Sequence, residues 1–233
     1  MKQINNHTLL RRYLSSPSYL RYFRDACWEG THIVEYAAGE YVLRQSAPPD
    51  HLFLMLTGRC YVRFFLSNGR SAILQSLRAP CLIGEVELFQ NTTPLLVQAL
   101  ERTRMLAIPL SQCREDLLRD PHFLRQVCSD LIVKERNETL SLLHTFGYPL
   151  ENRLAKFILD NRQENRFYIR KTLIAESLGA SYRHVETVMS GFVDKGYLSK
   201  ERLVYTITDE KALAALVREL EPSSGLWQPP AFL

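Results

Sequence analysis

The sequence lacks any long apolar run, which argues against a membrane protein. No stretch of its 233 residues approaches the roughly 18 consecutive apolar residues of a membrane-spanning helix. Residues 1–20 are polar and are interrupted by Pro17, so they lack the apolar core of a secretion signal. We therefore expect a cytoplasmic protein without a membrane partner.

Clustered cysteines are absent too. The five cysteines are scattered, at Cys27, Cys60, Cys81, Cys113 and Cys128. Metal sites built from cysteine usually contain a pair separated by about two to four residues, and disulfide frameworks are rare in a cytoplasmic chain of this size. We expect small buried apolar side chains here and no metal site, and the pattern assigns no cofactor.

Enzyme signatures are missing as well. The chain contains no GxSxG, HExxH or P-loop motif, so we predict that it is not an enzyme. The formal net charge of +4 is only mildly basic. Its distribution is more informative, because residues 153–202 are rich in Lys and Arg whereas residues 83–101 contain acids but no Lys or Arg.

Residues 31–109 have the pattern of short strands separated by turns. Apolar or alternating runs occupy 33–36, 41–43, 52–56, 60–66 and 72–74. Between two of them, Asn68-Gly69 is a strong signal for a two-residue hairpin, because both residues tolerate positive φ. Several strands at this spacing predict an antiparallel sandwich or barrel.

A long helix is expected over residues 120–146, after a short helix at 111–118. Asp120 can cap its N-terminus, and Pro121 suits the first helical position because a missing N–H costs nothing there. Gly147-Tyr148-Pro149 ends it.

The long helix carries a narrow apolar stripe, formed by Leu124, Val127, Leu131 and Leu142. One narrow stripe is typical of a coiled coil, although Glu135 and Glu138 also lie on it and weaken the pattern. We favour a seam between two copies of the chain in a homodimer. The alternative is a helix packed on its own domain.

Shorter helices follow, at 150–161, 171–178 and 182–195, and two short strands at 197–198 and 203–207 form a hairpin. The chain therefore divides into a sensory domain at 1–119 with flanking helices, a dimerisation helix at 120–146, a C-terminal domain at 149–220 and a loose tail at 221–233. The fold class is α+β.

The strongest local motif spans residues 172–188. Ala175 is small enough to let two helices cross closely, Gly179 can supply the positive φ of the turn, and Ser181 is an N-cap residue for the second helix. This is the pattern of a helix-turn-helix, whose second helix enters the DNA major groove by its N-terminal residues. A purely structural helix pair is the alternative.

Helix phase places long polar groups on the exposed side of the second helix, where they could reach base edges or phosphates. We expect Arg183 to contact a guanine base and Lys171 to contact a phosphate. The full predicted DNA-binding set is Lys171, Thr172, Ser181, Tyr182, Arg183, His184, Thr187, Lys200 and Arg202.

The chain resembles the CRP/FNR superfamily of bacterial transcription regulators, and within it the YeiL-like branch. The resemblance covers nearly the whole chain and includes Ala38-Gly39-Glu40-Tyr41, Leu54-Met55-Leu56-Thr57-Gly58-Arg59, Ser67-Asn68-Gly69-Arg70, residues 79–88, residues 152–159 and the helix-turn-helix. It implies a cyclic-nucleotide-binding-like β-roll, a long helix that pairs two subunits and a winged helix-turn-helix. The implied partners are a double-stranded DNA operator, a second copy of the chain and RNA polymerase, with the protein acting as an activator.

The resemblance also implies an effector pocket, at Gly84, Glu85, Glu138 and Thr139. In nucleotide-binding relatives an Arg about ten residues after the Gly-Glu pair neutralises the phosphate. Residues 91–97 hold no Arg here, and Glu138 would repel an anion. We therefore expect Gly84-Glu85 to be a tight turn with a capping carboxylate, and cyclic AMP not to be the effector.

Cofactor chemistry known from other relatives finds little support. Only Cys27 lies near the N-terminus, where oxygen-sensing relatives hold an iron–sulfur cluster with several cysteines, and His32 and His51 have no companion ligands. The recognition stretch also departs from the usual pattern, because Arg183 and Thr187 replace a Glu and an Arg. We expect a different operator. A regulatory module that binds a cyclic nucleotide or another small ligand is the alternative function.

Overall fold

The computed structural model describes residues 1–24, 26–65, 67, 71–90, 92–168 and 170–220. The predicted Asn68-Gly69 hairpin, Asn91 and the tail at 221–233 lie outside them. The chain forms two compact units, Met1–Glu135 and Arg136–Leu233. No helix in the described part is long and apolar enough to cross a membrane.

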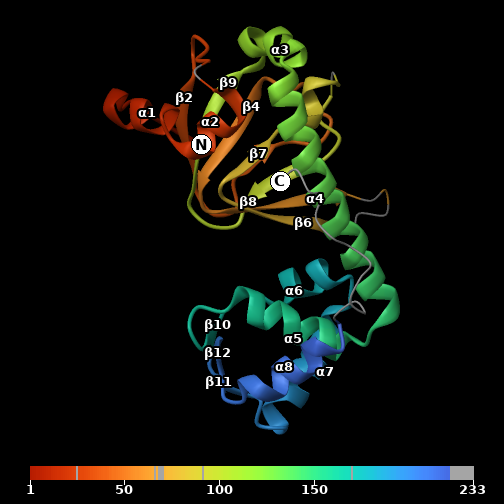
Figure 1. Ribbon diagram of the computed structural model, residues 1–233. Coiled ribbons are helices and arrows are strands. Elements are labelled where there is room, and N and C mark those ends of the chain that lie inside the picture. Colours follow the sequence, from red (N-terminus) through yellow and green to blue (C-terminus); the bar gives the residue numbers. More distant parts are fainter. Residues whose placement is uncertain (25, 66, 68–70, 91, 169, 221–233) are drawn as a thin grey trace. The chain divides into compact units, whose positions relative to one another are not determined.

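The N-terminal unit is an antiparallel β-roll made of two sheets (Figure 1). One sheet has the order β1-β2-β9-β4-β7 and the other the order β3-β8-β5-β6. The strands are β1 (Lys2–Ile4), β2 (His32–Tyr36), β3 (Tyr41–Leu43), β4 (His51–Thr57), β5 (Arg59–Phe65), β6 (Ser71–Arg78), β7 (Cys81–Ile83), β8 (Leu96–Ala99) and β9 (Thr103–Pro109). The predicted antiparallel β architecture is therefore confirmed.

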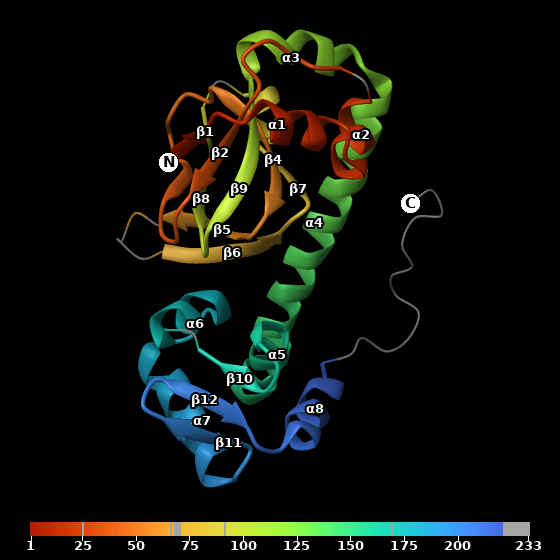
Figure 2. The ribbon, with the colours of Figure 1, turned by 90° about the vertical axis from the view of Figure 1, so that its left-hand side faces the viewer.

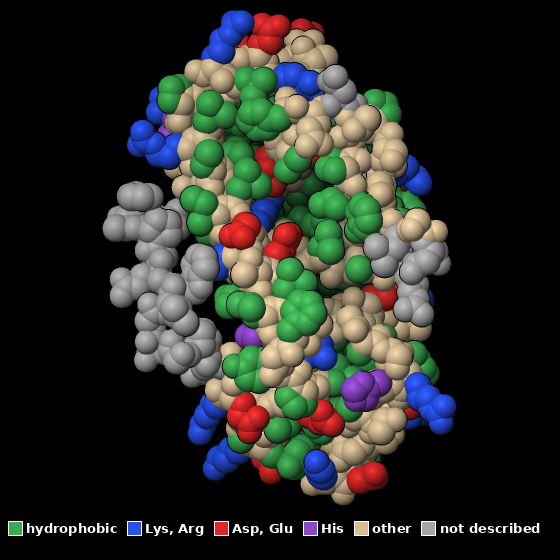
Figure 3. Space-filling view, turned by 90° about the vertical axis from the view of Figure 1, so that its right-hand side faces the viewer, with side chains coloured by type: hydrophobic (Ala, Val, Ile, Leu, Met, Phe, Trp, Pro, Cys, Tyr) green, Lys and Arg blue, Asp and Glu red, His purple; other side chains and the backbone are tan. Residues whose placement is uncertain are grey.

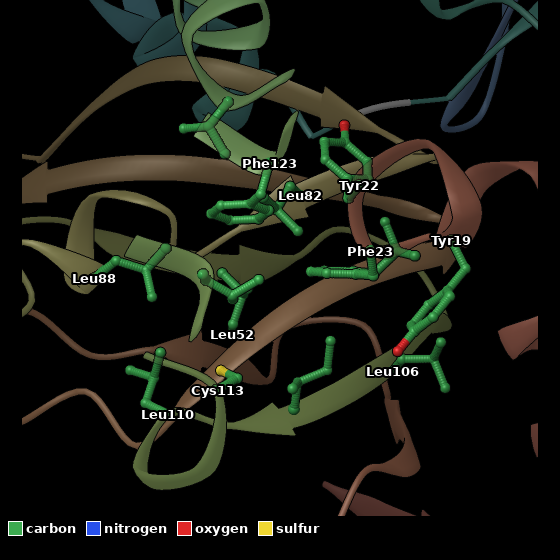
Figure 4. Packing of buried hydrophobic residues seen from close by; sticks show 14 of the residues in the cluster. Tyr19, Tyr22, Phe23, Leu52, Leu82, Leu88, Leu106, Leu110, Cys113 and Phe123 are labelled. Carbon is green, nitrogen blue, oxygen red and sulfur yellow. The ribbon is translucent and has the colours of Figure 1, made fainter. Parts of the chain in front are cut away.

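The first sheet is buried on both faces, which explains the continuous apolar run in β4. Phe53 and Met55 point into the roll, toward the second sheet. Leu52 and Leu54 point the other way and pack under helices, as the close-up in Figure 4 shows for Leu52. A strand covered on both sides gains from apolar residues at every position rather than at alternate ones.

Helices cover the outer face of that sheet. They are α1 (His7–Leu14), α2 (Pro17–Phe23), α3 (Leu110–Arg119) and the first part of α4 (Pro121–Gly147), and a 3-10 turn, η1 (Val86–Leu88), lies after β7. Tyr19, Tyr22 and Phe23 of α2 are almost fully buried, and Phe23 stacks on Phe123 of α4 with ring centroids 5.8 Å apart. Figure 2 shows α1 and α2 beside this sheet.

Helix α4 begins and ends where the sequence predicts. The Asp120 carboxylate accepts a hydrogen bond from the His122 amide at 2.9 Å, and Pro121 occupies the first position. The first three residues of the apolar stripe, however, pack within the chain, whereas Leu142 is 59% exposed. Val127 is 2% exposed in the N-terminal core, and Leu124 and Leu131 are half-buried against the same core. The expectation that Val127 faces a second copy is therefore wrong.

The cysteines divide by environment. Cys60 and Cys113 are buried as expected, and burial raises the pKa of each thiol, to about 12 and about 11 respectively. Cys27 and Cys128 are exposed, contrary to the expectation of buried side chains. No group of three or more residues able to hold a metal ion occurs among the described residues.

The C-terminal unit has a core of its own beneath a three-stranded sheet of order β10-β12-β11 (Figure 2). Its elements are α5 (Leu150–Asn161), β10 (Arg166–Phe167), α6 (Lys171–Leu178), α7 (Tyr182–Asp194), β11 (Leu198–Glu201), β12 (Val204–Ile207) and α8 (Glu210–Arg218). Ile174 of α6 and Val185 of α7 are fully buried together in this core. The antiparallel hairpin of β11 and β12 is the predicted wing.

Candidate nucleic-acid interface

The turn between α6 and α7 has the geometry that its sequence predicts. Gly179 ends α6 in the left-handed region, at φ 59°, which costs glycine little. The Ala180 amide then donates to the Ala175 carbonyl at 3.0 Å and closes the bend. Ser181 caps α7, because its hydroxyl accepts from the His184 amide at 3.2 Å.

Burial fixes which side of α7 is free. Val185, Val188, Met189 and Phe192 face the core, at 5% exposure or less. The opposite side leaves Tyr182, Arg183, His184 and Thr187 exposed on the first two turns. The Thr187 hydroxyl donates to the Arg183 carbonyl at 3.0 Å, which orients it along the helix. The structure thus brings the predicted base-reading residues together on one accessible face.

Two further features surround this face. On the wing, Lys200 and Arg202 are exposed, and the Lys200 ammonium lies 5.8 Å from the centroid of the Tyr205 ring, a cation–π arrangement. Behind the turn, the Arg153 guanidinium donates to the Leu178 carbonyl at 2.6 Å and holds the end of α6 against α5.

Lys171 has a partner that the sequence did not reveal. Its ammonium donates to the Glu186 carboxylate at 2.9 Å, across the two helices of the motif. Lys171 and Glu186 are 15 residues apart, so no local spacing signals the pair. Thr172, also in the predicted set, is exposed beside Lys171 on α6.

The predicted effector residues lie in two places. Gly84 has φ 95°, so it forms the expected tight turn. Glu85 does not cap η1 through its side chain, which corrects the expectation of a capping carboxylate. It forms an ion pair with Lys134 of α4 instead, and the same ammonium donates to the Leu82 carbonyl at 3.0 Å. Glu138 and Thr139 lie on the part of α4 that belongs to the C-terminal unit.

The Glu85–Lys134 pair is well enclosed. The Lys134 side chain is 17% exposed and that of Glu85 is 8% exposed. Burial alone would lower the pKa of Lys134, but Glu85, Cys81 and Asp130 together raise that pKa, so the ammonium stays charged. Lys134 was not among the predicted site residues, because 49 residues separate it from Glu85.

Comparisons with known proteins agree with both units. A cyclic nucleotide-binding domain model matches residues 33–120, and a Crp-like helix-turn-helix domain model matches residues 152–216. The regulatory protein YeiL of Escherichia coli O157:H7 is 36% identical over 202 residues, which cover 85% of this chain and 92% of that protein. The chain belongs to the CRP/FNR superfamily of transcription regulators.

Two further similarities extend this result. The transcriptional activator protein anr of Pseudomonas aeruginosa is 24% identical over 188 residues, covering 76% of this chain and 77% of that protein. A crystal structure of a CRP/FNR-family regulator from Eubacterium rectale has the same fold, with a TM-score of 0.73 and 18% identity over 90% of this chain and 97% of that chain. The family and the helix-turn-helix make this a DNA-binding regulator rather than an enzyme.

Proposed function

We propose that the chain is a sequence-specific transcription regulator that binds its operator as a homodimer, with α7 in the major groove. The observation that carries the proposal is the exposed first turn of α7, held by the Ser181 cap and bearing Arg183. The first turn is the part of a recognition helix that reaches base edges. RNA polymerase is a further partner in this proposal, with the protein acting as an activator.

Arg183 is assigned to base recognition. Its planar fork of donors matches guanine O6 and N7, and a bidentate pair discriminates by about 1–3 kcal/mol against a wrong base. Thr172, Ser181, Tyr182, His184 and Thr187 complete the surface on the two helices, and Lys200 and Arg202 supply wing contacts to phosphates.

Selection of bound duplexes from a random DNA pool tests the proposal, repeated at several salt concentrations. We expect a symmetric motif with half-sites about 34 Å apart, centre to centre. With Arg183→Ala we expect the base preference to relax at one symmetric pair of positions. The matched control is Lys195→Ala, which removes an exposed cation after the end of α7. Uniform loss of affinity with unchanged base preferences would make Arg183 a phosphate contact.

The dimer seam is proposed along the exposed apolar residues of α4, which include Leu142 of the predicted stripe. Ile132 is 48% exposed, Leu142 59% and Phe146 86%. With Thr139 they follow steps of seven, three and four residues, the heptad spacing of a coiled coil. Figure 3 faces the side on which α4 lies in Figure 1, and hydrophobic side chains gather there over the N-terminal unit.

Sedimentation measures this seam directly. We expect Ile132→Asp and Leu142→Asp each to shift the protein from dimer to monomer, because a charge at a heptad core position is costly. The control is Asn137→Asp, which places the same charge on an exposed position of the same helix. A dimer that survives both seam substitutions would place the interface elsewhere.

We also propose that cyclic AMP is not the effector. Residues 91–97 contain no Arg, and the Glu85 carboxylate is already bound by Lys134. Calorimetric titration with cyclic AMP and cyclic GMP tests this, and micromolar binding of either would contradict it. The Gly84–Glu85 turn remains the proposed effector region for a ligand of other chemistry.

A further inference from the structure

The Lys171–Glu186 ion pair lies within the surface proposed to contact DNA. Lys171 is the first residue of α6, where an unpaired cation would face the phosphate backbone of a bound duplex. Its side chain is only 18% exposed, whereas that of Glu186 is 49% exposed. The ammonium is thus paired with an acid of the recognition helix, and little of the Lys171 side chain is exposed.

Both groups are charged at neutral pH. The hydrogen bond from Lys171 lowers the pKa of Glu186, and the same bond raises the pKa of Lys171. Lys200 of the wing also lowers the pKa of Glu186, so two cations act on this carboxylate. An exposed carboxylate without such cations would be repelled by the phosphates.

We infer that Glu186 is a positioning residue that withholds the Lys171 ammonium from DNA phosphates, so that affinity for every duplex is lower than the number of cations on this face implies. The inference rests on the proposed DNA-binding function. A phosphate contact adds affinity without sequence information. When an internal carboxylate prevents this phosphate contact, operator and non-operator binding are therefore weakened alike. The base preference set by Arg183 is unchanged.

The salt dependence of binding measures this directly. Each phosphate neutralised by a cation contributes a slope of about −0.9 in log affinity against log salt. In the dimer, Glu186→Gln should free two ammonium groups and steepen the slope by about 1.8. Between 50 and 200 mM salt the variant should then lose about tenfold more affinity than the unmodified protein. The base preferences should not change.

The decisive comparison is a double-mutant cycle of Lys171 and Glu186 in the full-length protein. The salt dependence of binding is measured with one duplex of random sequence and one selected duplex. Lys171→Met keeps the side-chain length, and we expect it to change the slope by less than half a unit per subunit because the ammonium is not on a phosphate. In the Lys171→Met background, Glu186→Gln should no longer steepen the slope. Glu201→Gln, which removes an exposed acid from the wing, is the matched control.

Several results would overturn the inference. A slope made shallower by about one unit per subunit in Lys171→Met would show that Lys171 reaches a phosphate despite Glu186. Equal steepening by Glu186→Gln in both backgrounds would show general charge repulsion, and no steepening would show that the pair has no effect on binding. A change in base preference would make Glu186 a base-reading residue. Loss of the proposed function has a different signature, since the unmodified protein would then bind neither duplex.

Discussion

Replacement of Lys134 by Met should destabilise the N-terminal unit by about 3 kcal/mol. The change keeps the side-chain length but leaves the Glu85 carboxylate, 8% exposed, without its cation. It also removes the donor that the Leu82 carbonyl accepts at 3.0 Å. Breaking a buried ion pair by removing one partner typically costs about 3–5 kcal/mol. The low end applies here because the Lys134 side chain is still 17% exposed.

Urea unfolding followed by tryptophan fluorescence can isolate this unit. The chain has two tryptophans, and Trp227→Phe leaves only Trp28, whose indole packs edge-on against Phe23 in the N-terminal unit. In that background, Lys134→Met should lower the unfolding free energy by the stated amount, and Lys134→Met with Glu85→Gln should recover at least half of it, because no unpaired charge remains.

Arg119→Met is the matched control for this experiment, because it removes a cation from an ion pair with Glu115 that is about four-fifths exposed at both ends. We expect a change within about 0.5 kcal/mol. A cost below about 1 kcal/mol for Lys134→Met, with no recovery in the double variant, would refute the claim that Glu85 depends on Lys134.

Three further outcomes are expected. Burial raises the pKa of Glu87, so the folded unit binds the proton of this carboxyl group more tightly than the unfolded chain does. The stability of the unit should therefore fall as pH rises from 4.5 through the raised pKa. Glu87→Gln should remove that fall, measured by urea unfolding with Trp28 fluorescence. Gly179→Ala should destabilise the C-terminal unit by about 1 kcal/mol, since alanine is strained at φ 59° and its Cβ meets only Thr145 at 3.8 Å. Ser181→Ala should cost about 1 kcal/mol and speed amide hydrogen exchange at the start of α7.

The helix-turn-helix could be predicted from sequence because each of its parts has a local signal. Gly179 indicates the turn, and Ser181 indicates the N-cap of α7. The spacing of Val185 and Val188 indicates the buried face, and all these signals lie within a short segment. The boundaries of α4 were equally accessible, since Asp120-Pro121 begins it and Gly147 ends it. In both cases the backbone conformation follows from the nearest residues.

The rest of the fold depends on contacts between distant segments. Strand β9 was not among the predicted strands. Met105 and Leu106 are both fully buried, on opposite faces of the sheet, and the strand is placed by pairing with β2 and β4, which are far from it in the sequence. The two ion pairs at the sites, Lys134–Glu85 and Lys171–Glu186, join separate elements and have no signature along the chain.

The rotational setting of α4 explains why Val127 packs on its own domain rather than facing outward. Asp130 and Lys134 are four residues apart and share one side of the helix, where Asp130 accepts from Arg21 at 2.7 Å and Lys134 binds Glu85. Ile132 is two residues from each, which at about 100° per residue places it on the opposite side. Its 48% exposure follows from that rotation. A helix with apolar residues on two edges does not reveal by spacing alone which edge packs inward. The polar contacts of Asp130 and Lys134 decide it, and they leave the edge at Ile132 exposed.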